Sequence, residues 1–360
     1  MQRASLDTAV VITWIGHATF LIQAPGITIL TDPIFGKPSW LFPRITEPGI
    51  RINDLPPIDY VLISHNHWDH LHKESMQALY ARNPNMQVLV PAGDGKYLRS
   101  WGIAAVHEHQ WWQKMSAVPR YNCSLCSQSL GMSTVHPACA PQLEERRREC
   151  RAQRLSVEAL ANSEGVSKSP AFDSAPFDSA QGERSPITLS DYEVIVSKGH
   201  SFTFTPACHW SQRTPFDRNK SLWGSWMIEL AGTTIYFAGD TAYATHFKAI
   251  ARRFRTIDVA LMPVGPCEPH RWMHRSHISA EDAGQAFLEL GARTFVPMHW
   301  GTFYFGTDLA VTPIKRLQAW WQMHQSRLRA CDMQVLHPGQ QCVTVPKRNP
   351  AQERAPEQGL

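Results

Sequence analysis

Three histidines and one aspartate lie within six residues of this chain, at His65, His67, Asp69 and His70. Imidazole nitrogens and carboxylate oxygens are the ligands that zinc and its first-row neighbours take in proteins. Two histidines at i and i+2, followed by an adjacent Asp–His pair, allow one loop to direct ligands at two metal ions, and hydrolases use metal pairs about 3.5–4 Å apart. The alternative is a chance surface cluster, because the chain holds 17 histidines in 360 residues.

Three later residues occur in the same setting, each at the end of an apolar β-type run. His209 follows residues 203–208, Asp240 follows 235–239 and His299 follows 295–298. A single histidine after a strand is more often a packed core residue than a ligand. Together, however, the seven residues complete two sets of ligands: His65, His67 and His209 for one metal, Asp69, His70 and His299 for the other, with Asp240 shared. Each metal then has four protein ligands and room for a shared water.

The elements that must position these ligands are short strands that end at the polar residues. Residues 58–64 form such a run before the His/Asp cluster, and residues 10–23 and 27–31 are β-rich runs separated by the turn-forming Ala24, Pro25 and Gly26. Residues 74–82 have the apolar face of a helix, and residues 87–91 indicate another strand. Loops that leave strand ends on a rigid scaffold are where functional sites are usually built.

The second half of the chain repeats this order of strands followed by helices. We expect strands at residues 192–205, with a turn at 198–200, and at 225–230, 233–238, 257–264 and 294–298, and helices at 247–254, 280–290 and 314–329. Strands then helices, repeated twice, fit two sheets packed face to face with helices outside. The expected fold class is therefore α+β.

The composition changes between residues 115 and 189, which we predict to be a largely disordered insertion because the second half is rich in Ser, Pro, Ala and Asp without periodicity. The remaining chain then divides into an N-terminal tail (1–9), a single catalytic domain (10–114 and 190–344) and a disordered C-terminal tail (345–360). The insertion carries Cys123, Cys126, Cys139 and Cys150. Cys123 and Cys126 are half of a structural zinc motif, but no second C-x-x-C pair completes it, which favours free thiols.

The overall composition is that of a globular protein with no demand for a nucleic-acid partner. The net charge is +4, and 43% of the residues are hydrophobic. No apolar run approaches the roughly 18–20 residues that span a bilayer, and the first residues lack a signal-peptide cleavage site. Eight scattered cysteines suit a reducing compartment. We expect a cytoplasmic protein, and a homodimer is compatible with the sequence.

The spacing of the seven candidate ligands resembles that of the metallo-β-lactamase superfamily. Further motifs resemble the N-acylphosphatidylethanolamine-hydrolysing phospholipase D family: WIGHAT from Trp14, LTDPIF from Leu30, LPPID from Leu55, LWGSW from Leu222, FAGDT from Phe237 and HWGTF from His299. The resemblance covers residues 12–336 apart from the insertion.

This resemblance implies an αββα four-layer sandwich and two Zn²⁺ per chain, held by the seven ligands. It also implies that Trp68, where relatives carry a smaller aromatic residue, contacts substrate, and that His277 lies near the scissile phosphate. Plain packing over the loop is the alternative for Trp68. From their positions in the motifs, His17, Asp32 and Thr241 are expected to hold the ligands in place.

The implied reaction is hydrolysis of N-acylphosphatidylethanolamine-like phospholipids to N-acylethanolamine and phosphatidate. A hydroxide bridging the two metals would attack phosphorus in line, with Asp240 orienting it, and His277 would donate to the phosphate or protonate the leaving alkoxide. One alternative is a lactonase or small-molecule phosphodiesterase of the same fold. A non-catalytic metal- or lipid-binding protein is a second alternative, although it should have lost a ligand. Iron is disfavoured, because His67 supplies nitrogen where a carboxylate suits iron better.

A lipid substrate requires an apolar approach to the site. Four aromatic clusters fall in loops or at strand exits, at residues 40–42, 111–112, 272–273 and 303–305. We expect two of the four to be exposed and to form a rim that dips into a membrane interface. This would place the protein peripherally at the inner face of the membrane. Core packing is the alternative for each cluster.

Overall fold

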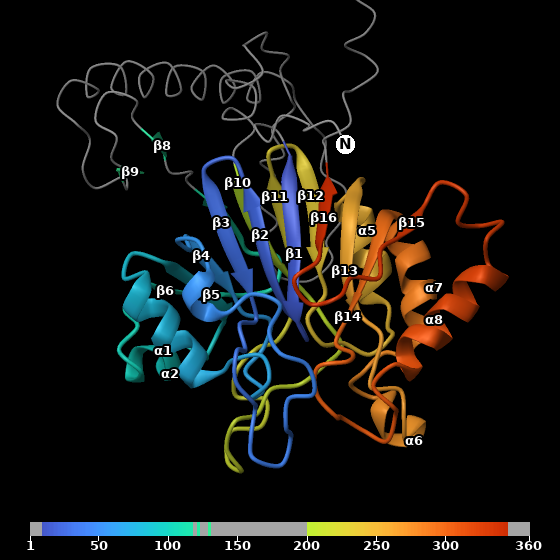
Figure 1. Ribbon diagram of the computed structural model, residues 1–360, viewed down its shortest axis with the longest axis horizontal. Coiled ribbons are helices and arrows are strands. Elements are labelled where there is room, and N and C mark those ends of the chain that lie inside the picture. Colours follow the sequence, from blue (N-terminus) through green and yellow to red (C-terminus); the bar gives the residue numbers. More distant parts are fainter. Residues whose placement is uncertain (1–8, 118–120, 123–128, 131–199, 345–360) are drawn as a thin grey trace, which may run out of the picture. The chain divides into compact units, whose positions relative to one another are not determined.

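Two seven-stranded sheets form the centre of the protein, as the computed structural model shows for residues 9–117, 121–122, 129–130 and 200–344 (Figure 1). The first sheet has the order β16-β1-β2-β3-β4-β5-β6. Its strands are β1 (Val10–Gly16), β2 (Thr19–Ala24), β3 (Ile27–Thr31), β4 (Tyr60–Leu62), β5 (Gln87–Pro91), β6 (Val106–His109) and β16 (Gln341–Thr344). Neighbours from β3 to β6 are parallel, so their carboxyl ends share one edge.

The second sheet has the order β15-β14-β13-β12-β11-β10-β7. Its strands are β7 (Lys114–Ala117), β10 (His200–Thr205), β11 (Ser225–Leu230), β12 (Thr233–Phe237), β13 (Ile257–Pro263), β14 (Ala292–Met298) and β15 (Asp332–Met333). The strands from β12 to β15 are parallel. This sheet therefore also gathers several strand ends at one edge.

Side chains that alternate along each strand point to opposite faces of the sheet and so contribute to different layers. On β1, Ile12 and Trp14 belong to the large core that also holds Phe202 and Trp226 of the second sheet, whereas Ile15 belongs to a separate core shared with α1 (Lys73–Arg82). This second core also includes residues of α2 (Gly95–Ser100). On the other side, α5 (His246–Arg253), α7 (Ala280–Leu290) and α8 (Thr312–Met323) cover the second sheet (Figure 1). The predicted αββα sandwich is confirmed.

Several boundaries differ from the predictions for physical reasons. The run at residues 10–23 is two strands, because His17 takes a positive φ of 56° and the chain turns back. The helix predicted to reach residue 329 ends at Met323. The short elements α2, β6, β7, α6 (His270–Met273), β15 and β16 were not predicted, since their few residues carry too little periodicity.

The predicted start of the insertion at residue 115 is wrong. Met115, Ser116 and Ala117 pair with β10 in the second sheet, and the compact units divide after Pro119 and after Ser190. In the unit of residues 120–190, the structure describes one antiparallel pair, β8 (Tyr121–Asn122) with β9 (Ser129–Leu130). The four cysteines of the insertion and both predicted tails, apart from Ala9, lie outside the described residues. Across the described parts of the chain, no helix has the length and apolar character to cross a bilayer.

Candidate metal centre

The seven predicted ligands lie in loops at the carboxyl ends of strands from both sheets. β4 leads to His65, His67, Asp69 and His70, while β10, β12 and β14 lead to the other three. Backbone contacts tie these loops together, because Gly224 N donates to Ser64 O at 2.9 Å and His299 N donates to His17 O at 3.1 Å. In Figure 1 loops hang below the sheets at this end.

His65, His67 and His209 form the first group. His67 Nδ1 lies 2.9 Å from His65 Nε2 and 3.1 Å from His209 Nε2. Ligand atoms that bind one zinc tetrahedrally at about 2.0–2.1 Å stand about 3.3–3.4 Å apart. The three ring nitrogens therefore already converge at nearly the spacing that a metal ion requires.

Asp69, His70 and His299 form the second group, which His17 joins. Asp69 Oδ2 lies 3.4 Å from His70 Nε2, 3.7 Å from His299 Nε2 and 2.9 Å from His17 Nε2. The four residues offer ligand atoms that all lie within 4.8 Å of one another.

Asp240, the predicted shared ligand, lies between the two groups. Its carboxylate oxygens are 3.3 Å from His70 Nε2 and 3.1 Å from His299 Nε2 in the second group. They are 4.0 Å from His65 Nε2 and 3.9 Å from His209 Nε2 in the first. Burial by itself would raise the pKa of Asp240, but His299 and His70 hold it well below its ordinary value. An anionic oxygen is thus available to both groups.

Three buried atoms that face the cluster have no hydrogen-bond partner among the described residues. They are His70 Nε2, His299 Nε2 and Asp240 Oδ1, which lie close to one another without the geometry of a hydrogen bond. Leaving polar atoms buried without partners is costly. Metal ions at the cluster would give ligand nitrogens and oxygens partners, so the donor set fits a centre that takes borderline divalent cations such as zinc.

Neighbouring polar groups fix the orientation of the histidine rings. Asp32 Oδ2 lies 2.7 Å from His70 Nδ1, and Ser64 Oγ lies 2.9 Å from His65 Nδ1. His209 Nδ1 donates to the carbonyl of Ser276 at 2.7 Å. In each case the contact at Nδ1 turns Nε2 toward the cluster, which is how outer contacts orient metal ligands.

Two of the three predicted supporting residues are placed as expected. Asp32 holds His70, and His17 contacts Asp69. Burial, together with His299, lowers the pKa of His17 to about 3, so its imidazole is neutral at physiological pH. Thr241 contacts no ligand side chain directly. Its hydroxyl accepts from the backbone N–H of Cys208 at 2.9 Å, and it therefore positions the chain just before His209.

Gly239 allows the two sheets to approach at the site. Its φ is +60°, and a Cβ there would lie 2.4 Å from Ser64 Cβ. A side chain at this position would therefore push the loop that carries Asp240 away from the loop that carries His65.

His277 and Trp68 lie beside this cluster. His277 Nδ1 is 3.6 Å from Asp240 Oδ2, so the structure brings His277 to the predicted centre. Ser279 begins α7 as its N-cap, accepting from Asp282 N at 3.1 Å. Trp68 is 52% exposed, and its ring lies over the guanidinium of Arg213. Arg213 and Ser276 were missed, because their contacts join segments far apart in the sequence. Ser64 was missed although it contacts the adjacent His65.

A small open pocket adjoins the centre. His17 and His299 contribute to its wall, and the rest of the lining consists of Pro266, Trp300, Gly301, Phe303, Phe305, Asp308, Leu309, Ala310 and Pro313. The pocket therefore places several apolar side chains and one carboxylate beside two residues of the polar cluster.

Residues 28–149 and 148–300 match the profile described as the β-lactamase superfamily domain. The chain belongs to the β-lactamase superfamily. It is 25% identical over 303 residues to N-acyl-phosphatidylethanolamine-hydrolyzing phospholipase D 1 of Caenorhabditis elegans, covering 82% of this chain and 65% of the relative. It is 27% identical over 313 residues to the mitochondrial N-acyl-phosphatidylethanolamine-hydrolyzing phospholipase D of Saccharomyces cerevisiae, covering 85% and 50%. The chain thus spans between half and two thirds of the length of these relatives.

Among solved structures, the chain resembles Igni18, a metallo hydrolase from the archaeon Ignicoccus hospitalis. The TM-score is 0.52 at 17% identity, over 94% of this chain and 99% of that one. At this identity the likeness supports the fold. The fold agrees with the superfamily profile.

Proposed function

We propose that this protein is a two-zinc phosphodiesterase of the phospholipase D type, acting on N-acylphosphatidylethanolamine-like lipids. The observation that carries the proposal is the position of Asp240, between two groups of histidines and beside His277. The seven predicted residues are the proposed metal ligands. The two N-acyl-phosphatidylethanolamine-hydrolyzing relatives, each matched over more than four fifths of this chain, support the choice of substrate.

Each residue near the centre has a distinct proposed role. When bound, a pair of zinc ions supplies a nucleophilic hydroxide at neutral pH and neutralises charge on phosphoryl oxygens. Asp240 fixes the separation of the two ligand groups. His277 donates a hydrogen bond to the phosphate or a proton to the leaving alkoxide. Water then replaces the alcohol on phosphorus, which leaves N-acylethanolamine and phosphatidate.

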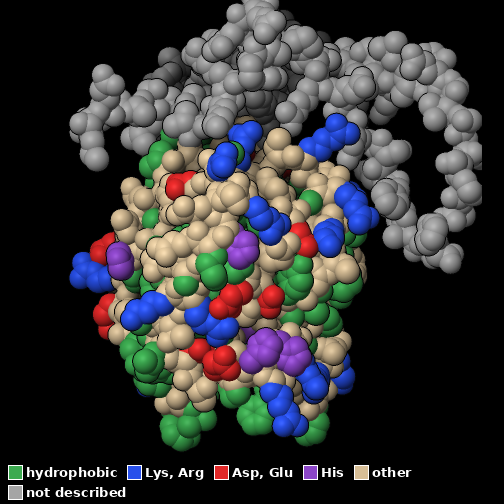
Figure 2. All heavy atoms as spheres, turned by 90° about the vertical axis from the view of Figure 1, so that its right-hand side faces the viewer, with side chains coloured by type: hydrophobic (Ala, Val, Ile, Leu, Met, Phe, Trp, Pro, Cys, Tyr) green, Lys and Arg blue, Asp and Glu red, His purple; other side chains and the backbone are tan. Residues whose placement is uncertain are grey.

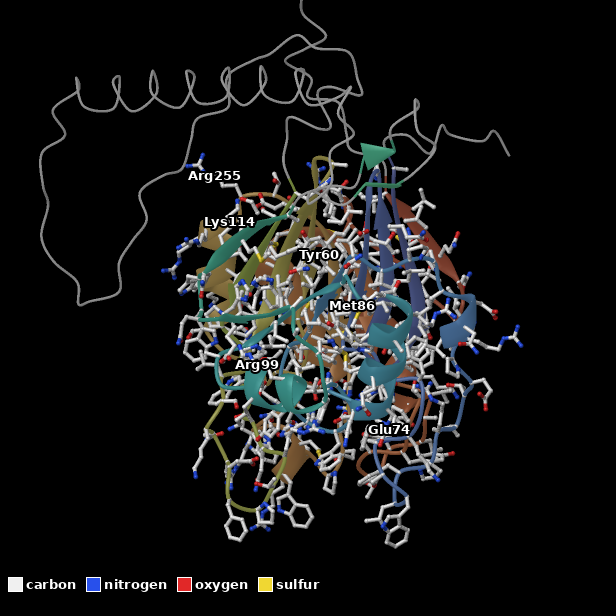
Figure 3. All side chains as sticks on the ribbon, turned by 90° about the vertical axis from the view of Figure 1, so that its left-hand side faces the viewer. Tyr60, Glu74, Met86, Arg99, Lys114 and Arg255 are labelled. Carbon is white, nitrogen blue, oxygen red and sulfur yellow. The ribbon has the colours of Figure 1, made fainter. Side chains whose placement is uncertain are left out.

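Exposed aromatic side chains on loops that follow β3, β13 and β14 support a lipid substrate. Trp40 is 80% and Trp272 68% exposed, and Tyr304 is also exposed, whereas its neighbour Phe303 is buried. Trp111 is exposed as well, so each of the four predicted clusters has an exposed member, whereas only two were expected to be exposed. Hydrophobic side chains protrude at the lower end in Figure 2, and rings protrude there in Figure 3, below Arg99 and Glu74. We propose that Trp40 and Trp272 enter the interface of a membrane.

The pocket beside the centre offers apolar side chains to a bound lipid. It opens beside His17 and His299, so we propose that the part of the lipid next to the phosphodiester contacts Phe303, Phe305 and Leu309.

The test compares zinc-loaded protein on three substrates: N-acylphosphatidylethanolamine vesicles, a lactone and a chromogenic phosphodiester. We expect preferred turnover of the lipid with release of N-acylethanolamine, and weaker vesicle binding by Trp40→Ser and Trp272→Ser. Val343→Ser, which removes an exposed apolar side chain from the edge strand β16, serves as the control for general loss of apolar surface. Activity on the lactone alone, or no activity in fully loaded protein, would overturn the proposed reaction.

A further inference from the structure

A buried arginine connects the two halves of the proposed metal centre. Arg213 lies four residues after His209, on the loop that follows β10 of the second sheet, and is 8% exposed. Its Nη1 donates to the carbonyl of Asn66 at 2.8 Å and to the carbonyl of Leu71 at 2.7 Å. Both acceptors belong to the loop after β4 of the first sheet.

The two carbonyls bracket the turn that carries three proposed ligands. Between them lie His67, Asp69 and His70, and the amides of His70 and Leu71 both donate to His67 O, at 3.1 and 2.9 Å. This short turn satisfies its central carbonyl internally, whereas its ends are held by the guanidinium. One charged nitrogen therefore fixes both ends of the turn.

Aromatic rings surround the same guanidinium. Its central carbon lies 4.5 Å from the ring centre of Trp68, 5.2 Å from that of Trp101 and 5.6 Å from that of Tyr97. Tyr97 belongs to α2, the helix on which Figure 3 labels Arg99, and Trp101 ends it. Cation–π contact of this kind orients both the ring and the cation. Arg213 thus orients the partly exposed ring of Trp68 and also holds the ligand turn.

The contacts of Arg213 suit a residue that orients the ligand turn better than one that neutralises a buried carboxylate. Among the residues that the structure describes, no carboxylate lies within ion-pair distance of its guanidinium. The neighbouring Asp217 instead accepts from the backbone N–H of Arg213 at 2.9 Å and from Tyr97 Oη at 2.6 Å. Asp217 therefore anchors the loop backbone, which leaves the planar guanidinium free to donate to the two carbonyls and to stack.

We propose that Arg213 is a positioning residue, which sets the ligand turn of the first sheet against His209 of the second and holds Trp68 for contact with the substrate head group. The proposal rests on the proposed metal centre, and its second part rests on the proposed lipid reaction. Loss of Arg213 should weaken metal binding and raise KM together, although Arg213 itself touches neither the metal ligand atoms nor the reacting phosphate.

The experiment compares Arg213→Met with a matched control, Arg253→Met. Arg253 also lies over a tryptophan, 5.2 Å from the ring centre of Trp112, but no hydrogen bond links it to the ligand turn. Zinc affinity is measured by competition with a chromogenic chelator, and Arg213→Met should bind zinc about 10–100-fold more weakly, as for other residues that orient metal ligands. The control should bind zinc like the wild type. Excess zinc should restore kcat of Arg213→Met, while KM stays raised.

Hydrogen–deuterium exchange of metal-free protein provides a readout that needs neither zinc nor substrate. Amides of residues 67–71 should exchange faster in Arg213→Met than in the wild type and the control. A folded Arg213→Met protein with wild-type zinc affinity and wild-type exchange would overturn the proposal. If Arg213→Met does not fold, Arg213→Lys is compared in its place, because lysine keeps the charge but lacks the planar fork and face. Wild-type zinc affinity in Arg213→Lys would also overturn the proposed role of Arg213. If the wild-type protein binds zinc but does not hydrolyse the lipid, the proposed reaction is refuted. The zinc-affinity and exchange measurements then still decide whether Arg213 positions the ligand turn.

Discussion

The substitution Asp32→Asn tests how the outer contacts of the metal centre control its ligands. Asp32 is fully buried, and its Oδ1 accepts from Ser64 N at 2.7 Å. Its Oδ2 accepts from Ser64 Oγ at 2.5 Å and lies 2.7 Å from His70 Nδ1. Asparagine has nearly the same shape and tolerates the positive φ of 33° at this position. The substitution therefore changes the hydrogen-bonding pattern with little change in packing.

The new amide group cannot satisfy both neighbours. With its NH₂ toward His70, two donors meet, and the His70 proton must move from Nδ1 to Nε2, the atom proposed to bind metal. With its NH₂ toward Ser64, it opposes the backbone N–H instead. Either arrangement forfeits a hydrogen bond to a charged group, which is worth about 1.5–3 kcal/mol. Since about 1.4 kcal/mol corresponds to tenfold in an equilibrium constant, zinc affinity should fall about 10–100-fold, in line with other outer-contact substitutions.

The assay is a zinc competition titration of wild type, Asp32→Asn and the control Asp258→Asn. Asp258 also accepts from a backbone N–H, that of Thr234 at 2.9 Å, but it lies next to Ile257 at the start of β13, away from the ligand loops. The control should keep wild-type affinity. A folded Asp32→Asn protein with wild-type zinc affinity would refute the tautomer argument and the proposed role of His70.

Three further predictions follow from single contacts. Gly239→Ala should destabilise the fold and impair zinc binding, because its Cβ would lie 2.4 Å from Ser64 Cβ, whereas Gly291→Ala, with φ +64° and no atom within 4 Å of the new Cβ, should cost only the roughly 1–2 kcal/mol of a left-handed backbone. Equal losses of thermal stability and of zinc affinity in Gly239→Ala and Gly291→Ala would contradict this. His277→Gln should lower kcat about 10²–10⁴-fold with unchanged zinc content, and a normal rate would remove His277 from the reaction. Burial raises the pKa of Asp94 to about 7, so between about pH 4 and 7 the native state keeps a proton that the unfolded state has lost, and stability falls as pH rises through this window. In urea unfolding, the free energy of unfolding of Asp94→Asn relative to that of the wild type should therefore rise by about 1–3 kcal/mol from pH 5 to pH 8. The same pH dependence of the free energy of unfolding in both proteins would refute this.

The layers, and the position of the seven candidate ligands at strand ends, could be predicted from the sequence because both depend on local patterns. Apolar runs that end at His209, Asp240 and His299 mark strand ends. The strands β12, β13 and β14 are parallel neighbours, and β10 runs in the same direction because it is separated from β12 by the antiparallel β11, so all of these ends meet at one edge. Helix α7 was predicted with its correct bounds, since its buried residues recur at helical spacing after the Ser279 cap.

The remaining features depend on pairing between distant segments. Strand β16 buries only Cys342 and is held by pairing with β1, more than 300 residues away. Arg213 contacts Asn66 across 147 residues, and no local pattern distinguishes it from a solvated arginine. Thr241 illustrates the opposite case, because its motif position predicted a contact with a ligand, whereas its hydroxyl accepts from the backbone before His209.

Titration of metal-free protein with zinc, with release of N-acylethanolamine from N-acylphosphatidylethanolamine followed at each addition, tests the central claim most directly. The proposed centre predicts that zinc binding saturates at two ions per chain and that hydrolysis reaches its maximum at the same point. In Asp240→Asn, which lacks the shared carboxylate, both the second ion and the activity should be lost. Full activity at one ion per chain, or a protein with two ions that leaves the phosphodiester intact, would contradict the account.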